Sequence, residues 1–184
     1  MSNVWGDEKL KEVLISGGVA VMPTDTIYGI VGQAIRPDTV EKIYMLRKRA
    51  PEKPCIILVG DISEIKKFGI DLSEIQMNIM AQAELPTSFI LDSTNEDFSY
   101  LDRGTKALAF RIPKIEELRS LLLDTGPLIA PSANTEGMMP AKNITEARAY
   151  FGGGVDCYMD GGDIVASPSR VVKLHSDGTT TIIR

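Results

Sequence analysis

Short apolar runs alternate with segments of helical periodicity along this chain, and the alternation constrains its fold more than any other feature. Residues 19–22 form an apolar run of the length and composition of a buried strand. Pro37 then opens a segment whose apolar residues Val40, Ile43 and Tyr44 share one face of a helix. A chain that repeats this pattern is predicted to fold as a sheet covered by helices.

The closing segment decides what kind of sheet to expect. The runs 170–174 and 180–184 are joined across Ser176, Asp177 and Gly178, which predicts an antiparallel hairpin. We therefore expect an α+β fold, a twisted sheet of parallel and antiparallel strands flanked by helices. The other predicted strands are residues 19–22, 55–59, 87–91, 107–111, 128–130 and 155–159, with a further apolar stretch at 27–34. The predicted helices are residues 7–16, 37–47, 62–68, 73–83, 115–123 and 145–151, and residues 95–105 are expected to be loop.

Composition fits one intracellular domain. A chain of 184 residues, 43% of them hydrophobic, can bury one core, and we expect residues 1–184 to form a single domain. No apolar run approaches the roughly 18 residues of a spanning helix, and the first residues do not resemble a secretory signal. Two cysteines are too few for a disulfide scaffold, so a reducing cytoplasm is expected, with Cys55 a buried thiol.

Several familiar chemistries are excluded by what the sequence lacks. It contains neither a P-loop nor the three-glycine dinucleotide fingerprint. The glycines at 152–154 follow a helical segment and are interpreted as a helix stop. His175 is the only histidine, which makes a histidine-rich metal site or a Ser-His-Asp triad improbable. We expect His175 on the surface near the hairpin turn.

A cluster of basic residues, RKRAPEK at 47–53, stands out in a chain of net charge −5. Arg47 continues the apolar face of the helix that begins at Pro37, so we expect it at the rim of the core, facing whatever the loop encloses. Arg49 and Lys53 can add forked and point-charge contacts to a polyphosphate. The alternative is a solvated basic loop, the usual fate of a charge run.

Polar residues also follow several predicted strands, where ligands usually dock in such folds. MPTDTIYGI places two threonines and Asp25 after the first strand, and these residues either hold a ligand or form a turn. Ser132 and Asn134 follow another strand and either cap the next turn or reach a ligand. Arg111 ends an apolar strand, where its guanidinium requires an anion, from a ligand or from an ion pair. Ser169 precedes the hairpin.

Taken in order, PTDTIYG, R-x-R-(x)3-KP, LAFRIP, PLIAPSAN and PSRVV resemble the YrdC-like family of threonylcarbamoyl-AMP synthases, over about residues 17–184. The resemblance implies a concave, basic cleft in which L-threonine, bicarbonate and ATP form threonylcarbamoyl-AMP and pyrophosphate, a nucleotidyltransferase reaction. The product would feed the threonylcarbamoyl modification of adenosine 37 (t6A37) in tRNA by downstream transfer proteins. Magnesium would be carried by ATP, and no metal ligand or acid-base residue of the protein is implied.

The resemblance also implies a role for each matching residue. The residues expected to bind threonine are Thr26, Arg111 and Ser169. The residues expected to bind ATP are Arg47, Arg49, Lys53, Ser132, Asn134 and Arg184. The chain departs from the family pattern at four places. Arg47 stands where lysine is common, the Pro-Gly before Pro86 is missing, Leu58 replaces a polar residue and Arg170 replaces a threonine. Longer family members carry a second domain after this one, which we do not expect here.

Two other functions remain open at the level of sequence. One is a noncatalytic module that binds double-stranded RNA or ribosomes through the basic loop, although the negative net charge and the aromatic content of 6% favour weak RNA binding at most. The other is a carbamoyl-adenylate enzyme that starts from carbamoyl phosphate, as in related domains of hydrogenase maturation factors. Those domains belong to longer chains with zinc fingers.

Overall fold

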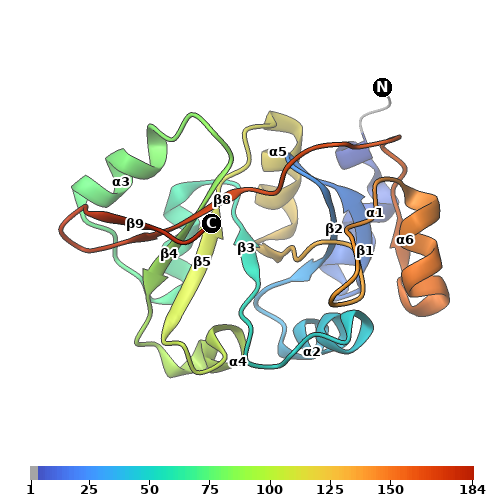
Figure 1. The fold of residues 1–184 in the computed structure, drawn as a ribbon, viewed down its shortest axis with the longest axis horizontal. Coiled ribbons are helices and arrows are strands. Elements are labelled where there is room, and N and C mark those ends of the chain that lie inside the picture. The colour runs from blue at the N-terminus through green and yellow to red at the C-terminus, as the bar shows by residue number, and fades with distance from the viewer. Residues whose placement is uncertain (1–3) are drawn as a thin grey trace.

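The computed structural model describes residues 4–184, whose strands form one mixed nine-stranded sheet (Figure 1). The strand order is β7-β1-β2-β6-β3-β5-β4-β8-β9. Three neighbouring pairs, β1 with β7, β3 with β5 and β4 with β8, are parallel, and the other five pairs are antiparallel. The strands are β1 (Ala20–Pro23), β2 (Tyr28–Gln33), β3 (Ile56–Leu58), β4 (Thr87–Asp92), β5 (Ala107–Arg111), β6 (Leu128–Ile129), β7 (Cys157–Tyr158), β8 (Arg170–Leu174) and β9 (Thr180–Ile182). The predicted mixed sheet and closing hairpin are confirmed.

Helices α1, α3 and α6 begin at side chains that cap them. The side chain of Asp7 accepts a hydrogen bond from the Leu10 N–H at the start of α1, and Ser73 and Gln76 form a capping box on α3. Gly152, with φ of +51°, ends α6, so the helix stop at 152–154 is confirmed. The helices are α1 (Glu8–Ile15), α2 (Pro37–Arg47), α3 (Glu74–Ala81), α4 (Ser99–Asp102), α5 (Glu116–Thr125) and α6 (Ile144–Phe151). Short 3₁₀ helices are η1 (Val4–Gly6), η2 (Ile62–Phe68), η3 (Glu96–Phe98) and η4 (Gly152–Gly154).

Two predicted segments differ from the structure. Residues 95–105 were expected to be loop but contain η3 and α4, because Leu101 is buried in the core and the Tyr100 hydroxyl donates to the Ala34 carbonyl at 2.9 Å. Tertiary contacts thus stabilise a turn of helix too short to show periodicity. Residues 62–68 are helical as predicted, but the helix, η2, is a 3₁₀ helix. His175 is half-buried, its Nε2 lying 3.1 Å from the Thr181 hydroxyl.

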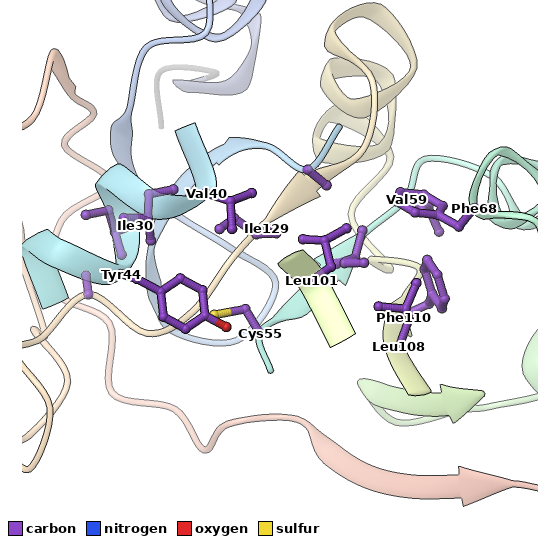
Figure 2. Packing of buried hydrophobic residues seen from close by; sticks show 14 of the residues in the cluster. Ile30, Val40, Tyr44, Cys55, Val59, Phe68, Leu101, Leu108, Phe110 and Ile129 are labelled. Atoms are coloured by element: carbon purple, nitrogen blue, oxygen red, sulfur yellow. The ribbon is translucent and has the colours of Figure 1, made fainter. Parts of the chain in front are cut away.

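Two hydrophobic clusters lie on the two faces of the sheet. The smaller one packs α1 and α5 against β1, β2, β3 and β6 through residues such as Leu14, Met22 and Leu122. The larger one includes residues of α2 and η2, and Figure 2 shows Tyr44 and Phe68 on opposite sides of the part that it draws. Cys55 lies within it as a buried thiol, as predicted. No helix within residues 4–184 is long and apolar enough to cross a membrane. That residues 1–184 form a single domain stays a prediction.

Candidate active site

One cleft of about 450 Å³ opens where the ends of several strands meet, and most of the residues selected from the sequence line it. Four arginines line the cleft, and its lining includes no aspartate or glutamate from the part of the chain that the structure describes. The arginine, serine and threonine residues of the lining are Thr24, Thr26, Arg47, Arg49, Thr105, Arg111, Ser132, Ser169 and Arg184. The cleft is therefore basic, as the fold prediction requires.

Strand β5 explains how the sheet leaves room for the cleft. Successive side chains of a strand point to opposite faces, and Ala107, Ala109 and Arg111 face the cleft while Leu108 and Phe110 enter the core. The two alanines leave space that larger side chains would fill. Arg111 follows them on the same face, so its guanidinium reaches the cleft from the end of the strand.

The turn between β1 and β2 supplies two hydroxyl groups. Thr24 donates its hydroxyl proton to the Ile27 carbonyl at 2.7 Å, so it reverses the chain as a threonine turn does. Its oxygen lies 3.1 Å from the Thr26 hydroxyl, which must therefore be the donor of that contact. Because the Thr26 hydroxyl donates its proton to Thr24, the Thr26 oxygen can still accept a hydrogen bond at the cleft wall. The segment can therefore form the turn and also hold a ligand, so the two interpretations of the sequence are compatible.

Arg111 is held by a buried ion pair. Its Nη2 lies 2.9 Å from Asp25 Oδ1, and the two side chains are only 4% and 2% exposed. Burial, reinforced by the charge of Arg184, lowers the pKa of Arg111, whereas Asp25 raises it. The guanidinium Nε is buried without a hydrogen-bond partner in residues 4–184. The ion pair fixes the guanidinium group at the cleft wall and leaves Nε as a buried donor.

Ser169 and Arg184 lie together on the side of the cleft formed by β4 and β8. The hydroxyls of Ser169 and Ser88 are 2.9 Å apart, and Arg184 Nη2 donates to the Ser169 carbonyl at 3.3 Å. Arg184 is also close enough to Arg111 to lower its pKa. The structure thus places Arg184, which the resemblance assigns to ATP, beside residues that the resemblance assigns to threonine.

Arg47 reaches the cleft from the last turn of α2. Its Nε donates to the Asn134 carbonyl at 3.1 Å, and its Nη2 donates to Ser132 Oγ at 3.1 Å and to Asn134 Oδ1 at 3.2 Å. The residue is 3% exposed, and burial, followed by the charge of Arg49, lowers its pKa. Among the described residues Nη1 has no hydrogen-bond partner and is buried. The expected position of Arg47 at the rim of the core is confirmed.

Arg49 shapes the basic loop from within. Its guanidinium donates to the carbonyls of Lys53 and Pro54 at 3.0 Å and 2.9 Å, while the Tyr44 hydroxyl donates to the same Lys53 carbonyl at 2.7 Å. Burial is the largest cause that raises the pKa of Tyr44, so it remains a donor. The loop is folded back on itself, with Arg49 on the cleft side.

Two residues selected from the sequence are not in the lining. Lys53 points to Glu136, with Nζ 2.5 Å from Oε1, and its side chain is 55% exposed. Asn134 is buried behind Arg47, where its amide donates to the carbonyls of Thr135 and Met138, both at 2.8 Å. Asn134 thus holds the arginine and the following turn.

Sequence reasoning gave no role to Glu136 and none specifically to Asp25. Arg111 signalled that an anion was needed nearby, and the PTDTIYG turn contains the aspartate that supplies it. Glu136 gave no signal, because its partners Ala50 and Lys53 lie more than eighty residues away along the chain. Within residues 4–184 no group of three or more His, Cys, Asp or Glu side chains could hold a metal ion.

Comparison with known proteins identifies the family. A model for Sua5, YciO and YrdC proteins, described as "Telomere recombination", matches residues 12–184. The chain belongs to the Sua5/YciO/YrdC family. Among curated family members, threonylcarbamoyl-AMP synthase of Idiomarina loihiensis is 28% identical over 94% of this chain and 94% of its own length. The protein of the same name from Dichelobacter nodosus is 30% identical over 92% of this chain and 90% of its own length.

A solved structure shows the same fold in the Sua5/YciO/YrdC family. The crystal structure of P. abyssi Sua5 complexed with L-threonine matches 95% of this chain with a TM-score of 0.85 at 21% identity. This chain spans about half of that protein, 52% of its length. The YrdC-like fold expected from the sequence is therefore confirmed.

Proposed function

We propose that this chain joins L-threonine, bicarbonate and ATP into threonylcarbamoyl-AMP and releases pyrophosphate. Family members of nearly the same length are threonylcarbamoyl-AMP synthases. The observation that carries the proposal is one cleft lined by two pairs of arginines, Arg47 with Arg49 and Arg111 with Arg184. A reaction between a carboxylate-bearing amino acid and a nucleoside triphosphate needs cations for both partners in one enclosure.

The threonine side of the proposed site is built on Arg111. Arg111 lines the cleft, so its guanidinium would pair with the substrate carboxylate, while the Asp25 ion pair keeps the guanidinium in place. The Thr26 oxygen would accept a hydrogen bond from the substrate ammonium or hydroxyl. Ser169 would contribute a second hydroxyl at the same side.

The nucleotide side of the proposed site is built on Arg47 and Arg49. Arg47 and Arg49 both line the cleft, and phosphate oxygens are the acceptors that guanidinium donors favour. Ser132, which already accepts from Arg47, lines the cleft beside it. We propose that Lys53 and Arg184 complete the ATP contacts and that Asn134 acts on ATP through Arg47, which it holds in place.

The chemistry requires positioning and charge neutralisation more than acid-base catalysis. Bicarbonate loses hydroxide to give carbon dioxide, and the neutral threonine amine captures it, forming the N–C bond of the carbamate. The proton that the amine loses leaves with the hydroxide as water, and a carbamate oxygen then attacks the α-phosphorus. The bond from that phosphorus to the bridging oxygen breaks, and pyrophosphate leaves with the electron pair. Arginines that hold both reactants in line and neutralise the phosphates would stabilise this displacement. We assign no residue as general acid or base.

We propose that magnesium enters the cleft on the nucleotide. The cleft offers guanidinium and hydroxyl groups, and no acidic metal-binding cluster occurs in residues 4–184, so phosphate oxygens would hold the ion. When bound, it would neutralise part of the phosphate charge. We also propose a cytoplasmic setting in which the product passes to tRNA threonylcarbamoyl-transfer proteins, with weak RNA binding at most.

Pyrophosphate release from ATP tests the proposal. We expect release only when L-threonine and bicarbonate are both present, and carbamoyl phosphate should not replace them. Arg49→Ala should mainly raise the KM for ATP, and Arg111→Ala should mainly raise the KM for threonine. Release that ignores threonine would sink the proposal, and identical effects of the two variants would refute the assigned roles.

A further inference from the structure

Glu136 occupies the position at the basic loop where an anionic ligand would be expected. Its Oε2 accepts the Ala50 N–H at 2.5 Å, and its Oε1 accepts from Lys53 Nζ at 2.5 Å. A carboxylate bound at once by a backbone N–H and an ammonium group has the contacts that loops of this kind offer to phosphates. The loop therefore holds an anion from its own chain.

Backbone hydrogen bonds around Glu136 hold its carboxylate next to the basic loop. The Glu136 N–H donates to the Arg47 carbonyl at 2.8 Å, and the preceding Asn134 is fixed by Arg47 from the other side. The Lys53 ion pair, first among several contributions, lowers the pKa of Glu136, so the group is charged at neutral pH. The contact is not deeply buried, since Lys53 and Glu136 are 55% and 25% exposed. It can therefore open at small cost.

Lys53 is directed away from the cleft by this contact. It is absent from the cleft lining, although its neighbours Arg49 and Pro54 are part of it. A polyphosphate entering beside Arg49 would approach Glu136. The Glu136 carboxylate would repel it and would keep the Lys53 ammonium group from binding it. Both effects oppose binding of a highly charged ligand more than binding of a singly charged one.

We propose that Glu136 is an internal anion that a polyphosphate must displace, and that it thereby sets the affinity of the site for polyphosphate ligands. The proposal rests on the proposed function for its ligand. Displacement frees Lys53 and the Ala50 N–H to bind phosphate oxygens. Glu136 is thus a specificity-determining residue: it lowers the affinity for ligands whose phosphate chain must displace it, and it leaves the affinity for AMP, which binds without opening the contact, unchanged.

The decisive variant is Glu136→Gln, whose amide oxygen still accepts the Ala50 N–H while the charge on Lys53 is released. We expect tripolyphosphate to bind about two- to five-fold more tightly than to the wild type, the range of an exposed ion pair. AMP affinity should stay unchanged. The matched control is Asp124→Asn, which removes one charge and an exposed ion pair with Lys11 outside the cleft lining. It should bind tripolyphosphate as the wild type does.

A second measurement tests the contact between Lys53 and Glu136 without any phosphate ligand. Acetylation of Lys53, read by mass spectrometry against the exposed Lys48, should be faster in Glu136→Gln than in the wild type. Unchanged labelling, or tripolyphosphate binding that is equal or weaker in a folded Glu136→Gln protein, would overturn the proposal. If labelling rises and tripolyphosphate binding tightens but ATP is not consumed, the proposed function fails and the role of Glu136 stands.

Discussion

Replacing Arg111 by methionine should show how strongly the cleft depends on its buried ion pair. The substitution keeps an apolar stem of similar length but leaves Asp25 charged, with its side chain 2% exposed. An uncompensated buried charge costs about 3–5 kcal/mol. For a chain of this size, that loss corresponds to a melting temperature lower by roughly 6–20 °C. Urea unfolding followed by circular dichroism measures the free energy directly.

The double variant Asp25→Asn with Arg111→Met separates stability from binding. Removal of both charges should restore at least half of the lost stability, because the neutral amide costs less to bury. The restored protein should still fail to bind threonine, since the Arg111 donor is gone. Lys11→Met, which breaks a surface pair with Asp124, serves as control and should lower the free energy of unfolding far less than Arg111→Met does. A loss for Arg111→Met as small as the control's would refute the reasoning.

Three further variants test other parts of the structure. Arg47→Lys keeps the charge but loses the forked contacts, which should cost about 2 kcal/mol in urea unfolding while ATP still binds. Ala109→Leu should fill the cleft, so calorimetry should show weakened binding of both substrates in a folded protein. Burial raises the pKa of Asp156, but contacts with Lys42 and the Val19 N–H outweigh it, and the folded pKa lies below its ordinary value. Its contribution is therefore present above about pH 4 and is lost as pH falls through the folded pKa. Asp156→Asn should lower the urea midpoint at neutral pH and converge with the wild type in acid, whereas an equal gap at every pH would contradict this sign.

The RNA-binding alternative makes a different prediction for the same cleft. Arg47 and Arg111 are each 3% exposed, so neither can lie along the backbone of a duplex. Only a few cations of the loop remain for phosphate contacts, and the salt dependence of RNA binding should therefore be shallow. Tight, steeply salt-dependent RNA binding without ATP turnover would favour the noncatalytic module.

Most of the sheet could be predicted from the sequence because its strands are short apolar runs bounded by turn residues. Residues 107–111 show this clearly, since their apolar character and length fit a buried strand and β5 has those bounds. Helix α4 could not be predicted in the same way, because one turn carries no periodicity and Leu101 is held by contacts distant in sequence.

The residues of the candidate site could be predicted from the sequence, but the directions in which their side chains point could not. Arg47 and Arg111 follow from cations placed at the ends of apolar elements, where burial demands a partner. The direction of Lys53 depends on Glu136, and that of Asn134 depends on Arg47. Such pairs are separated by more than eighty residues, so local patterns carry no information about them. Only the folded chain brings them together.

The most direct test of the proposed synthesis uses isotopically labelled bicarbonate together with ATP and L-threonine, and traces where the label goes. We expect mass spectrometry to find the label in threonylcarbamoyl-AMP, with one pyrophosphate released for each molecule formed. The product should decline in Arg49→Ala and Arg111→Ala. Release of pyrophosphate without labelled threonylcarbamoyl-AMP, or release that does not depend on threonine, would contradict the proposed synthesis.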